Sequence, residues 1–327
     1  MKFALRRLGF YLLAAWVALT LNFFLPRLMP GDPATALFAR FKGALNPNAL
    51  EGLRQTFGLT NAPLWSQYFT YLRHVLLGDL GLSIAYFPAP VSSVIGSGLP
   101  WTLLLAGGSV VIAFILGTLL GVAAAFFRSG FIDTVLPPLF ALLGAFPYFW
   151  LSMVLLYALG FKWQLFPVGH AYGDDLSPSW SWLYISDVFR HAALPVASIV
   201  VATIGTWLLG MRNTMLAALQ SEPVMLARAK GLAPVQVALR YAARAALLPN
   251  LTGFGMALGF VLSGSLLTEI VFSYPGMGYL LVQAVRRQDY PLMQGIFLVI
   301  TLAVLGANWL VDMVTLWLDP RTRSEGT

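Results

Sequence analysis

The chain has 327 residues, of which 58% are apolar and only 10% charged, and its formal net charge is +7. Typical globular chains have about 45–50% apolar and about 25% charged residues, so this composition excludes water-soluble, disordered and fibrous proteins. The basic residues stand in short groups rather than on one stripe, which argues against nucleic-acid binding, and the absence of cysteine excludes disulfides and thiolate chemistry. The class that remains is a polytopic membrane protein.

Six apolar stretches are long enough to cross a membrane as helices, which requires about 20 mainly apolar residues. The predicted spans are residues 8–25, 100–127, 134–161, 192–211, 251–268 and 292–311. Each is continuously apolar, and backbone in lipid must satisfy its own hydrogen bonds, so the predicted fold class is all-α with six transmembrane helices. Pro147 and Pro195 are expected to kink the third and fourth spans, and Gly117 and Gly121 permit close packing of the second.

The distribution of lysine and arginine predicts which side each connection faces, because short cytoplasmic connections are enriched in them. Basic residues precede the first span, follow the second, lie between the fourth and fifth, and follow the sixth, so both termini are predicted to be cytoplasmic. Lys2, Arg6 and Arg7 also fit a secretory signal. The apolar run after them exceeds the about 7–15 residues of a signal core, and we interpret it as an uncleaved helix.

The spans divide the chain into three parts: residues 1–29 with the first span, an external segment of residues 30–99, and residues 100–327 with the other five spans. In the external segment, residues 46–48 can open a short helix and residues 63–77 have the periodicity of a second. The second helix either packs at the bundle or membrane interface, where tryptophan and tyrosine are enriched, or docks an external partner. The two roles can coexist.

The cytoplasmic segment of residues 212–249 is too polar for the membrane and too organised for a linker. Ser221 is a predicted N-cap, with Glu222 and Pro223 favoured in the first turn of the helix that follows. Gly231 is a natural C-terminal stop for that helix.

A second cytoplasmic helix, residues 235–248, places Arg240 and Arg244 one turn apart before Pro249 begins the fifth span. A capped helix held outside the membrane can act as a lever on the fourth and fifth spans. The alternative is a solvated connector, but such connectors are usually shorter.

Enzyme motifs are absent from the sequence. It contains no Gly-Lys pair for a phosphate-binding loop, no H-E-x-x-H zinc motif and no G-x-S-x-G elbow. The histidines, His74, His170 and His191, are dispersed through the external segments. No catalytic, cofactor-binding or metal-binding residues are therefore predicted in this chain.

Glu269 and Asp312 are ionisable side chains at the ends of the fifth and sixth predicted spans. Such groups are functional candidates, but near the end of a span they reach water at little cost, so the functional and structural alternatives both stay open. A proton-driven carrier would have more such groups near the midplane. We therefore expect the energy for any transport to come from a partner.

Short motifs follow one another along the whole chain in a specific order and spacing. They are L-M-P-G-D-P at 28–33, G-D-L-G-L-S at 78–83, A-R-A-K-G at 227–231, V-F-S-Y-P-G-M-G at 271–278 and D-Y-P at 289–291. Together they resemble the transmembrane subunits of bacterial ABC importers for dipeptides, oligopeptides and, in some members, nickel.

The resemblance implies a type I ABC importer permease in the bacterial cytoplasmic (inner) membrane that forms half of a translocation pathway for peptides or a similar small solute. It implies as partners a second, similar permease, two cytoplasmic ATPases that bind ATP and Mg, and an external substrate-binding protein. The alternative function is a stand-alone secondary transporter or channel. An intramembrane enzyme is contradicted by the missing nucleophile and metal motifs.

The resemblance also assigns roles to residues. The helix before Gly231 is expected to be the coupling helix that docks on an ATPase, with Met225 where the wider importer pattern has Glu and Pro223 where the peptide branch has Tyr. The expected coupling residues are Glu222, Met225, Ala227, Arg228, Ala229, Lys230 and Gly231. The expected pathway or external-gate residues are Glu269, Ser273, Tyr274, Pro275 and Gly276. For Glu269 two alternatives remain: attraction of a cationic group of the cargo, or anchoring of the loop that follows, by a hydrogen bond or an ion pair with Arg286 or Arg287.

Overall fold

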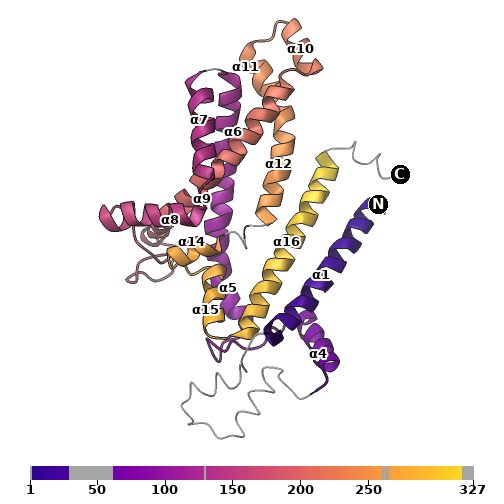
Figure 1. Ribbon diagram of the computed structural model, residues 1–327, viewed down its shortest axis with the longest axis vertical. Coiled ribbons are helices and arrows are strands. Elements are labelled where there is room, and N and C mark those ends of the chain that lie inside the picture. Colours follow the sequence, from indigo (N-terminus) through magenta and orange to yellow (C-terminus); the bar gives the residue numbers. More distant parts are fainter. Residues whose placement is uncertain (1, 29–61, 129, 260, 262–264, 319–327) are drawn as a thin grey trace. The chain divides into compact units, whose positions relative to one another are not determined.

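The computed structural model describes residues 2–28, 62–128, 130–259, 261 and 265–318 (Figure 1). Regular structure in these residues is helical, apart from one isolated β-bridge between Leu82 and Pro90. The predicted all-α fold class is confirmed. The helix predicted to open at residues 46–48 lies outside the described residues.

The chain forms two compact units, the first of residues 1–102, 275–309 and 319–327, and the second of residues 103–274 and 310–318. The helices of the first unit are α1 (Lys2–Leu28), α4 (Leu64–Leu76), α5 (Val91–Thr102), α15 (Met277–Arg286) and most of α16 (Tyr290–Leu318). Those of the second are α6 (Gly108–Phe126), α7 (Phe131–Gly144), α8 (Tyr148–Leu155), α9 (Trp182–Ala218), α10 (Glu222–Ala229), α11 (Pro234–Gln236), α12 (Arg244–Gly259) and α14 (Leu266–Val271), with the π-helical segments η1 (Leu103–Gly107), η2 (Leu156–Lys162) and η3 (Val237–Ala243).

Three helices in the described residues are long and apolar enough to cross a membrane: Val91–Phe126, Trp182–Ala218 and Tyr290–Leu310. They contain or closely match the second, fourth and sixth predicted spans. α1 contains a shorter apolar stretch, Leu8–Phe24, where the first span is predicted. These long apolar helices support a multi-pass membrane protein. The count of six spans stays a prediction.

The third predicted span is not one helix. It consists of Phe131–Gly144 and Tyr148–Lys162, which are bent by 96° at the break between them. Pro147 lies at the break with extended backbone (ψ 132°) and acts as N-cap of α8. Proline disfavours helical backbone at the residue before it and has no N–H to give to the preceding turn. The kink predicted at Pro147 is confirmed, and whether the two halves form one span over residues 134–161 stays a prediction.

The fifth span also begins differently from the prediction. Helical backbone runs from Pro234 through η3 into α12, and Pro249 lies inside α12 instead of starting a new helix. α12 ends at Gly259 and α14 begins at Leu266, and part of the intervening stretch lies outside the described residues. The predicted end of the cytoplasmic helix at residue 248 is therefore wrong.

Close packing of α6 on α9 forms the centre of the second unit, and glycine makes it possible. A methyl group placed on Gly117 would lie 2.6 Å from Trp207 Cβ, and one on Gly121 would lie 2.6 Å from the Leu208 carbonyl oxygen. The Trp207 ring contacts Phe114 of α6, with ring centres 5.4 Å apart. The predicted role of Gly117 and Gly121 in close helix approach is confirmed.

Candidate functional site

The helix α10 begins where the sequence predicts, but Ser221 does not cap it with its side chain. The backbone of Ser221 is extended (φ −74°, ψ 151°), as N-caps require. Its hydroxyl, however, donates a 2.6 Å hydrogen bond back to the Ala218 carbonyl at the end of α9. Ser221 therefore fastens α10 to the preceding helix, and Glu222 and Pro223 occupy the first turn of α10.

The end of α10 is a glycine stop in the left-handed conformation. Gly231 has φ +75°, its N–H donates to the Arg228 carbonyl at 2.9 Å, and the Leu232 N–H donates to the Ala227 carbonyl at 3.3 Å. This pair of bonds satisfies carbonyls that the helix end would leave open. The predicted stop at Gly231 is confirmed.

One face of α10 is buried against the rest of the second unit. Val224 and Ala227 are 2% and 3% exposed and belong to an apolar cluster that includes Met215 of α9 and Val237 of η3. Ala227 therefore packs inward. A displacement of α10 has to be shared by the end of α9 and by η3, because close-packed interiors resist deformation.

The opposite face of α10 carries two neighbouring exposed apolar side chains, Met225 (54%) and Leu226 (58%). The other predicted coupling residues Glu222, Arg228, Ala229 and Lys230 are exposed as well. Exposed apolar side chains beside charged ones are typical of protein interaction sites. Leu226 is absent from the sequence prediction, although an apolar residue next to Met225 on a polar helix could have indicated it.

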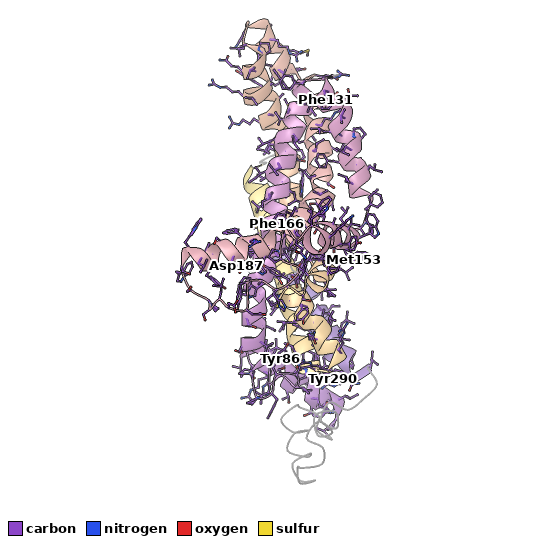
Figure 2. All side chains as sticks on the ribbon, turned by 90° about the vertical axis from the view of Figure 1, so that its left-hand side faces the viewer. Tyr86, Phe131, Met153, Phe166, Asp187 and Tyr290 are labelled. Atoms are coloured by element: carbon purple, nitrogen blue, oxygen red, sulfur yellow. The ribbon has the colours of Figure 1, made fainter. Side chains whose placement is uncertain are left out.

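Two interactions brace the ends of the helices near α10. Arg212 Nε of α9 donates to Asp133 Oδ1 of α7 at 2.5 Å. The Thr214 hydroxyl has three carbonyl oxygens within hydrogen-bond distance, two in its own helix and, at 3.3 Å, that of Ala246 in α12. In Figure 2, Phe131 at the start of α7 lies toward the α10 end of the second unit, whereas Met153 and Asp187 lie away from it.

Glu269 lies in α14 and is fully buried within the single chain. Its Oε1 accepts a 2.8 Å hydrogen bond from the Ser265 hydroxyl, and its carbonyl accepts a 2.8 Å bond from the Tyr274 N–H. A carboxylate without exposed surface cannot meet a solvated cargo in this conformation. The carboxylate thus bonds to Ser265 just before α14, and the bond to the following loop uses the backbone carbonyl, so both alternatives for the Glu269 side chain stay predictions.

The predicted gate residues adopt an unusual backbone. Ser273 has φ +48° and an exposed side chain, whereas Tyr274, the next residue, is 0% exposed. The Phe272 carbonyl just before them accepts a 3.0 Å bond from the His170 N–H. Non-glycine residues with positive φ cluster at functional sites. Pro275 and Gly276 belong to the other unit, where Gly276 is buried and is N-cap of α15.

A buried cluster of hydroxyl groups near α14 was missed by the sequence prediction. Ser152 of α8 donates to Ser198 of α9 at 2.8 Å and lies 3.4 Å from Thr268 of α14. All are 0% exposed. Single hydroxyls on three separate apolar helices give no signal in sequence, because only the tertiary packing brings them together.

In the first unit, α4 confirms the helix predicted over residues 63–77 and packs on α1. The Tyr68 hydroxyl lies 2.7 Å from Thr20 Oγ1, and Arg27 Nη2 donates to Gln67 Oε1 at 3.1 Å. The outer aromatic residues Trp65 and Phe69 stay 68% and 64% exposed. This pattern supports the packing and interfacial alternative for α4 and leaves the docking alternative untested.

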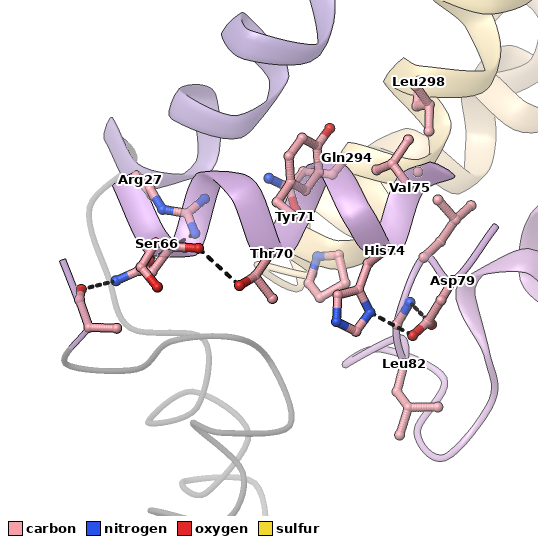
Figure 3. Close-up of a pocket in the computed structure, with 16 residues that line it drawn as sticks. Arg27, Ser66, Thr70, Tyr71, His74, Val75, Asp79, Leu82, Gln294 and Leu298 are labelled. Carbon is pink, nitrogen blue, oxygen red and sulfur yellow. Dashed lines mark hydrogen bonds and ion pairs between the residues drawn. The ribbon is translucent and has the colours of Figure 1, made fainter. Parts of the chain in front are cut away.

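Beside α4 lies a pocket of about 340 Å³ that Figure 3 shows in close-up. Its wall includes Arg27 of α1, Tyr71 of α4, the turn around Asp79, and Gln294 of α16. His74 Nδ1 lies 2.8 Å from Asp79 Oδ2, and this contact, with the Gly81 N–H, holds the pKa of Asp79 below its usual value. Asp79 thus stays ionised and fixes the turn beside the pocket.

Asp289 connects the segment around Ser83 and Ala85 to the start of α16. The sequence prediction did not identify it as a site. Its fully buried carboxylate accepts hydrogen bonds from the Ser83 hydroxyl, the Ala85 N–H (2.8 Å) and the Leu292 N–H (3.0 Å). The last bond makes it the N-cap of α16. Tyr86 and Tyr290, next to these contacts, are labelled in Figure 2. An aspartate at the start of the D-Y-P motif is compatible with a helix cap in sequence. The contact of Asp289 with Ser83, 206 residues away, has no such indication.

In the part of the chain that the structure describes, no three His, Cys, Asp or Glu side chains gather as metal ligands. His74 and His191 each lie beside an aspartate instead, Asp79 and Asp187 respectively.

The sequence was compared with known proteins. Residues 117–324 match the family described as binding-protein-dependent transport system inner membrane component. The dipeptide transport system permease protein of Lactococcus lactis subsp. cremoris is 32% identical, over 98% of this chain and 99% of its own length. The dipeptide transport system permease protein of Escherichia coli K12 is 32% identical and the di/tripeptide transport system permease protein of Pseudomonas aeruginosa 33% identical, each over 99% of both chains.

Proposed function

The chain belongs to the family of binding-protein-dependent transport system inner membrane components and is a permease subunit of an ABC importer, and we propose that its cargo is a short peptide. This membership argues against a stand-alone secondary transporter or channel. The cargo proposal rests on the relatives, whose names assign them dipeptides or di- and tripeptides.

The proposed assembly contains a second permease of the same kind, two cytoplasmic ATPases and an external binding protein that delivers the peptide. ATP and Mg belong to the ATPases, so this chain needs no cofactor and hydrolyses nothing itself. Both termini and α10 face the cytoplasm in this proposal, because the basic residues of the short connections lie on that side. Six spans complete the proposed topology.

The observation that carries the mechanism is the two-sided character of α10. Its outer face exposes Met225 and Leu226, and its inner face buries Val224 and Ala227 against α9 and η3. When the ATPase pair closes on ATP, a displacement of the outer face passes through the buried face to α9 and, through η3, to α12. Alternating access of the pathway follows from the movement of these two helices.

Leu226→Glu tests this coupling. Full burial of a leucine side chain in an interface contributes about 1.5–3 kcal/mol, so replacement by a charge should weaken ATPase docking by about 10- to 100-fold or more. The matched control is Leu183→Glu, which changes an equally exposed leucine at the other end of α9. The readouts are the ATPase retained on the purified permease and peptide uptake by proteoliposomes.

The absence of natural cysteine allows a second, direct readout. Leu226→Cys labelled with a thiol-reactive photo-cross-linker should cross-link to the ATPase on illumination, and Leu183→Cys with the same label should not. If Leu226→Glu transports normally and Leu226→Cys gives no cross-link in an active complex, then α10 is not the coupling helix.

A further inference from the structure

An open groove of about 470 Å³ lies in the second unit between α6, α9 and the helix formed by η3 and α12. Its wall is mainly apolar and includes Val122 of α6, Met211 of α9 and Leu247 of α12. Two arginines, Arg240 and Arg244, also line it. Met211 also belongs to the apolar cluster beneath α10 that the coupling mechanism uses, but that mechanism explains neither the two arginines nor the open space beside them.

No described residue neutralises the charges of the two arginines. Arg240 and Arg244 stand one turn apart and are both exposed, and neither makes an ion pair with any residue that the structure describes. Like charges at this spacing destabilise a helix unless an anion lies between them. Arg212, at the end of α9, differs from them because Asp133 pairs with it. The two arginines that line the groove thus have no ion-pair partner among the described residues, whereas Arg212 has one.

The charged side chains of the groove lie near one of its ends. Arg240 and Arg244 lie toward α10, whereas Leu247 is further along the helix in the direction of the apolar stretch of α12. On α6 the same direction leads from Val122 to Thr118. In Figure 1, α6 and α12 both extend away from the α10 end of the unit. A ligand in the groove would therefore meet the two cations beside Leu239 at the α10 end, and Leu247 with the Thr118 hydroxyl further from α10.

We propose that this groove binds an anionic phospholipid of the cytoplasmic leaflet. The phosphate lies between Arg240 and Arg244, and an acyl chain lies along Leu247 and Val122. The proposal rests on the cytoplasmic placement of α10 in the proposed function. A free phosphate ion would use the arginines but not the apolar wall, and basic grooves between helices on the cytoplasmic side of a membrane are suited to anionic lipid head groups.

Bound lipid would also affect coupling, because Arg240 lies in η3, next to Val237 and Ala238, which pack in the same apolar cluster as the inner face of α10. An anion that holds Arg240 and Arg244 together stabilises this stretch of helix. Import in the proteoliposomes should therefore be faster when the membrane contains anionic lipid.

The test is native mass spectrometry of the full chain with phosphatidylglycerol and phosphatidylcholine as probes. The wild-type chain should retain phosphatidylglycerol preferentially. One juxtamembrane cation contributes about a fivefold gain in affinity for anionic lipid, so R240Q/R244Q should lower the preference by about 25-fold. R240K/R244K keeps the charges and should retain most of it. The control K162Q/R190Q removes two exposed cations elsewhere in the unit and should change nothing.

A second pair of variants tests the apolar wall without changing any charge. Ala243→Trp fills the groove, and Ala245→Trp adds the same bulk at an exposed position outside it. Only Ala243→Trp should reduce lipid retention. Unchanged lipid retention in both R240Q/R244Q and Ala243→Trp would overturn the proposal and would favour a protein partner as the occupant of the groove. Displacement of the lipid by millimolar inorganic phosphate would overturn it in favour of an ion site. Because lipid retention needs no ATPase, these results do not depend on whether the peptide cargo is correct.

Discussion

Substitution of Gly231 tests whether the backbone at the end of α10 is required for coupling. Gly231 has φ +75°, and a side-chain carbon placed on it would meet no atom within 4 Å. The penalty of a substitution is therefore conformational, without a steric clash inside the chain. A left-handed conformation costs L-residues about 1–2 kcal/mol, a factor of about 5–30 in population, and asparagine less than others.

A series of three substitutions at Gly231 separates the backbone from the surface. Gly231→Asn should couple nearly as well as the wild type, Gly231→Ala should lose part of its coupling, and Gly231→Val should lose most, because a β-branched residue is least tolerant of positive φ. The assay is ATP hydrolysis stimulated by the loaded binding protein, with thermal unfolding of the same complexes as control. Equal loss in all three variants would show that the ATPase contacts the glycine surface. Full activity of Gly231→Val would refute the requirement for the stop.

Three further substitutions test the fold around the site. Asp289→Ala should lower the stability of the chain by about 1–3 kcal/mol in thermal unfolding, because it leaves buried donors and the start of α16 unsatisfied; an unchanged melting temperature would contradict the cap. Glu269→Gln should leave peptide import near the wild-type rate because it can still accept the Ser265 hydroxyl; abolished import by a normally assembled complex would favour the cargo role of the carboxylate instead. Gly117→Val should disrupt α6–α9 packing and destabilise the chain by about 1–3 kcal/mol or more, whereas Gly108→Val, which meets no atom within 4 Å, should not; equal effects would contradict the close contact.

Local chemistry made several elements predictable from the sequence. Gly231 could be assigned as a helix stop because a glycine after a capped helix favours one specific backbone conformation. Pro147 could be assigned as a kink because proline removes a helical hydrogen bond. Neither residue type predicts the size of a bend. The 96° angle at Pro147 depends on what the two halves of the predicted span pack against.

The errors have a common cause in tertiary structure. Ser221 was predicted to accept a bond from its own helix, yet it donates to Ala218, since the turn from α9 brings that carbonyl within 2.6 Å. Pro249 was predicted to begin a helix, but helical backbone continues through it, and the packing of the following turns on α9 outweighs local preference. Asn250, one residue later, donates to the Trp207 carbonyl at 3.4 Å.

The contact between Asp289 and Ser83 could not be predicted from either segment alone. Ser83 and Asp289 lie in two of the motifs that carry the family resemblance, so the sequence singled out both segments without indicating that they touch. Their contact explains why the turn and the start of α16 need these residue types, since a buried carboxylate requires several donors.

Uptake by the reconstituted importer tests the central claim most directly. Proteoliposomes would contain this permease with its proposed second permease and ATPases, and a loaded binding protein and a labelled dipeptide would be supplied from the side opposite α10. Accumulation should require enclosed ATP and Mg, require the binding protein, and persist when ionophores abolish all ion gradients. Accumulation driven by an ion gradient without ATP, or by this chain alone, would contradict the account.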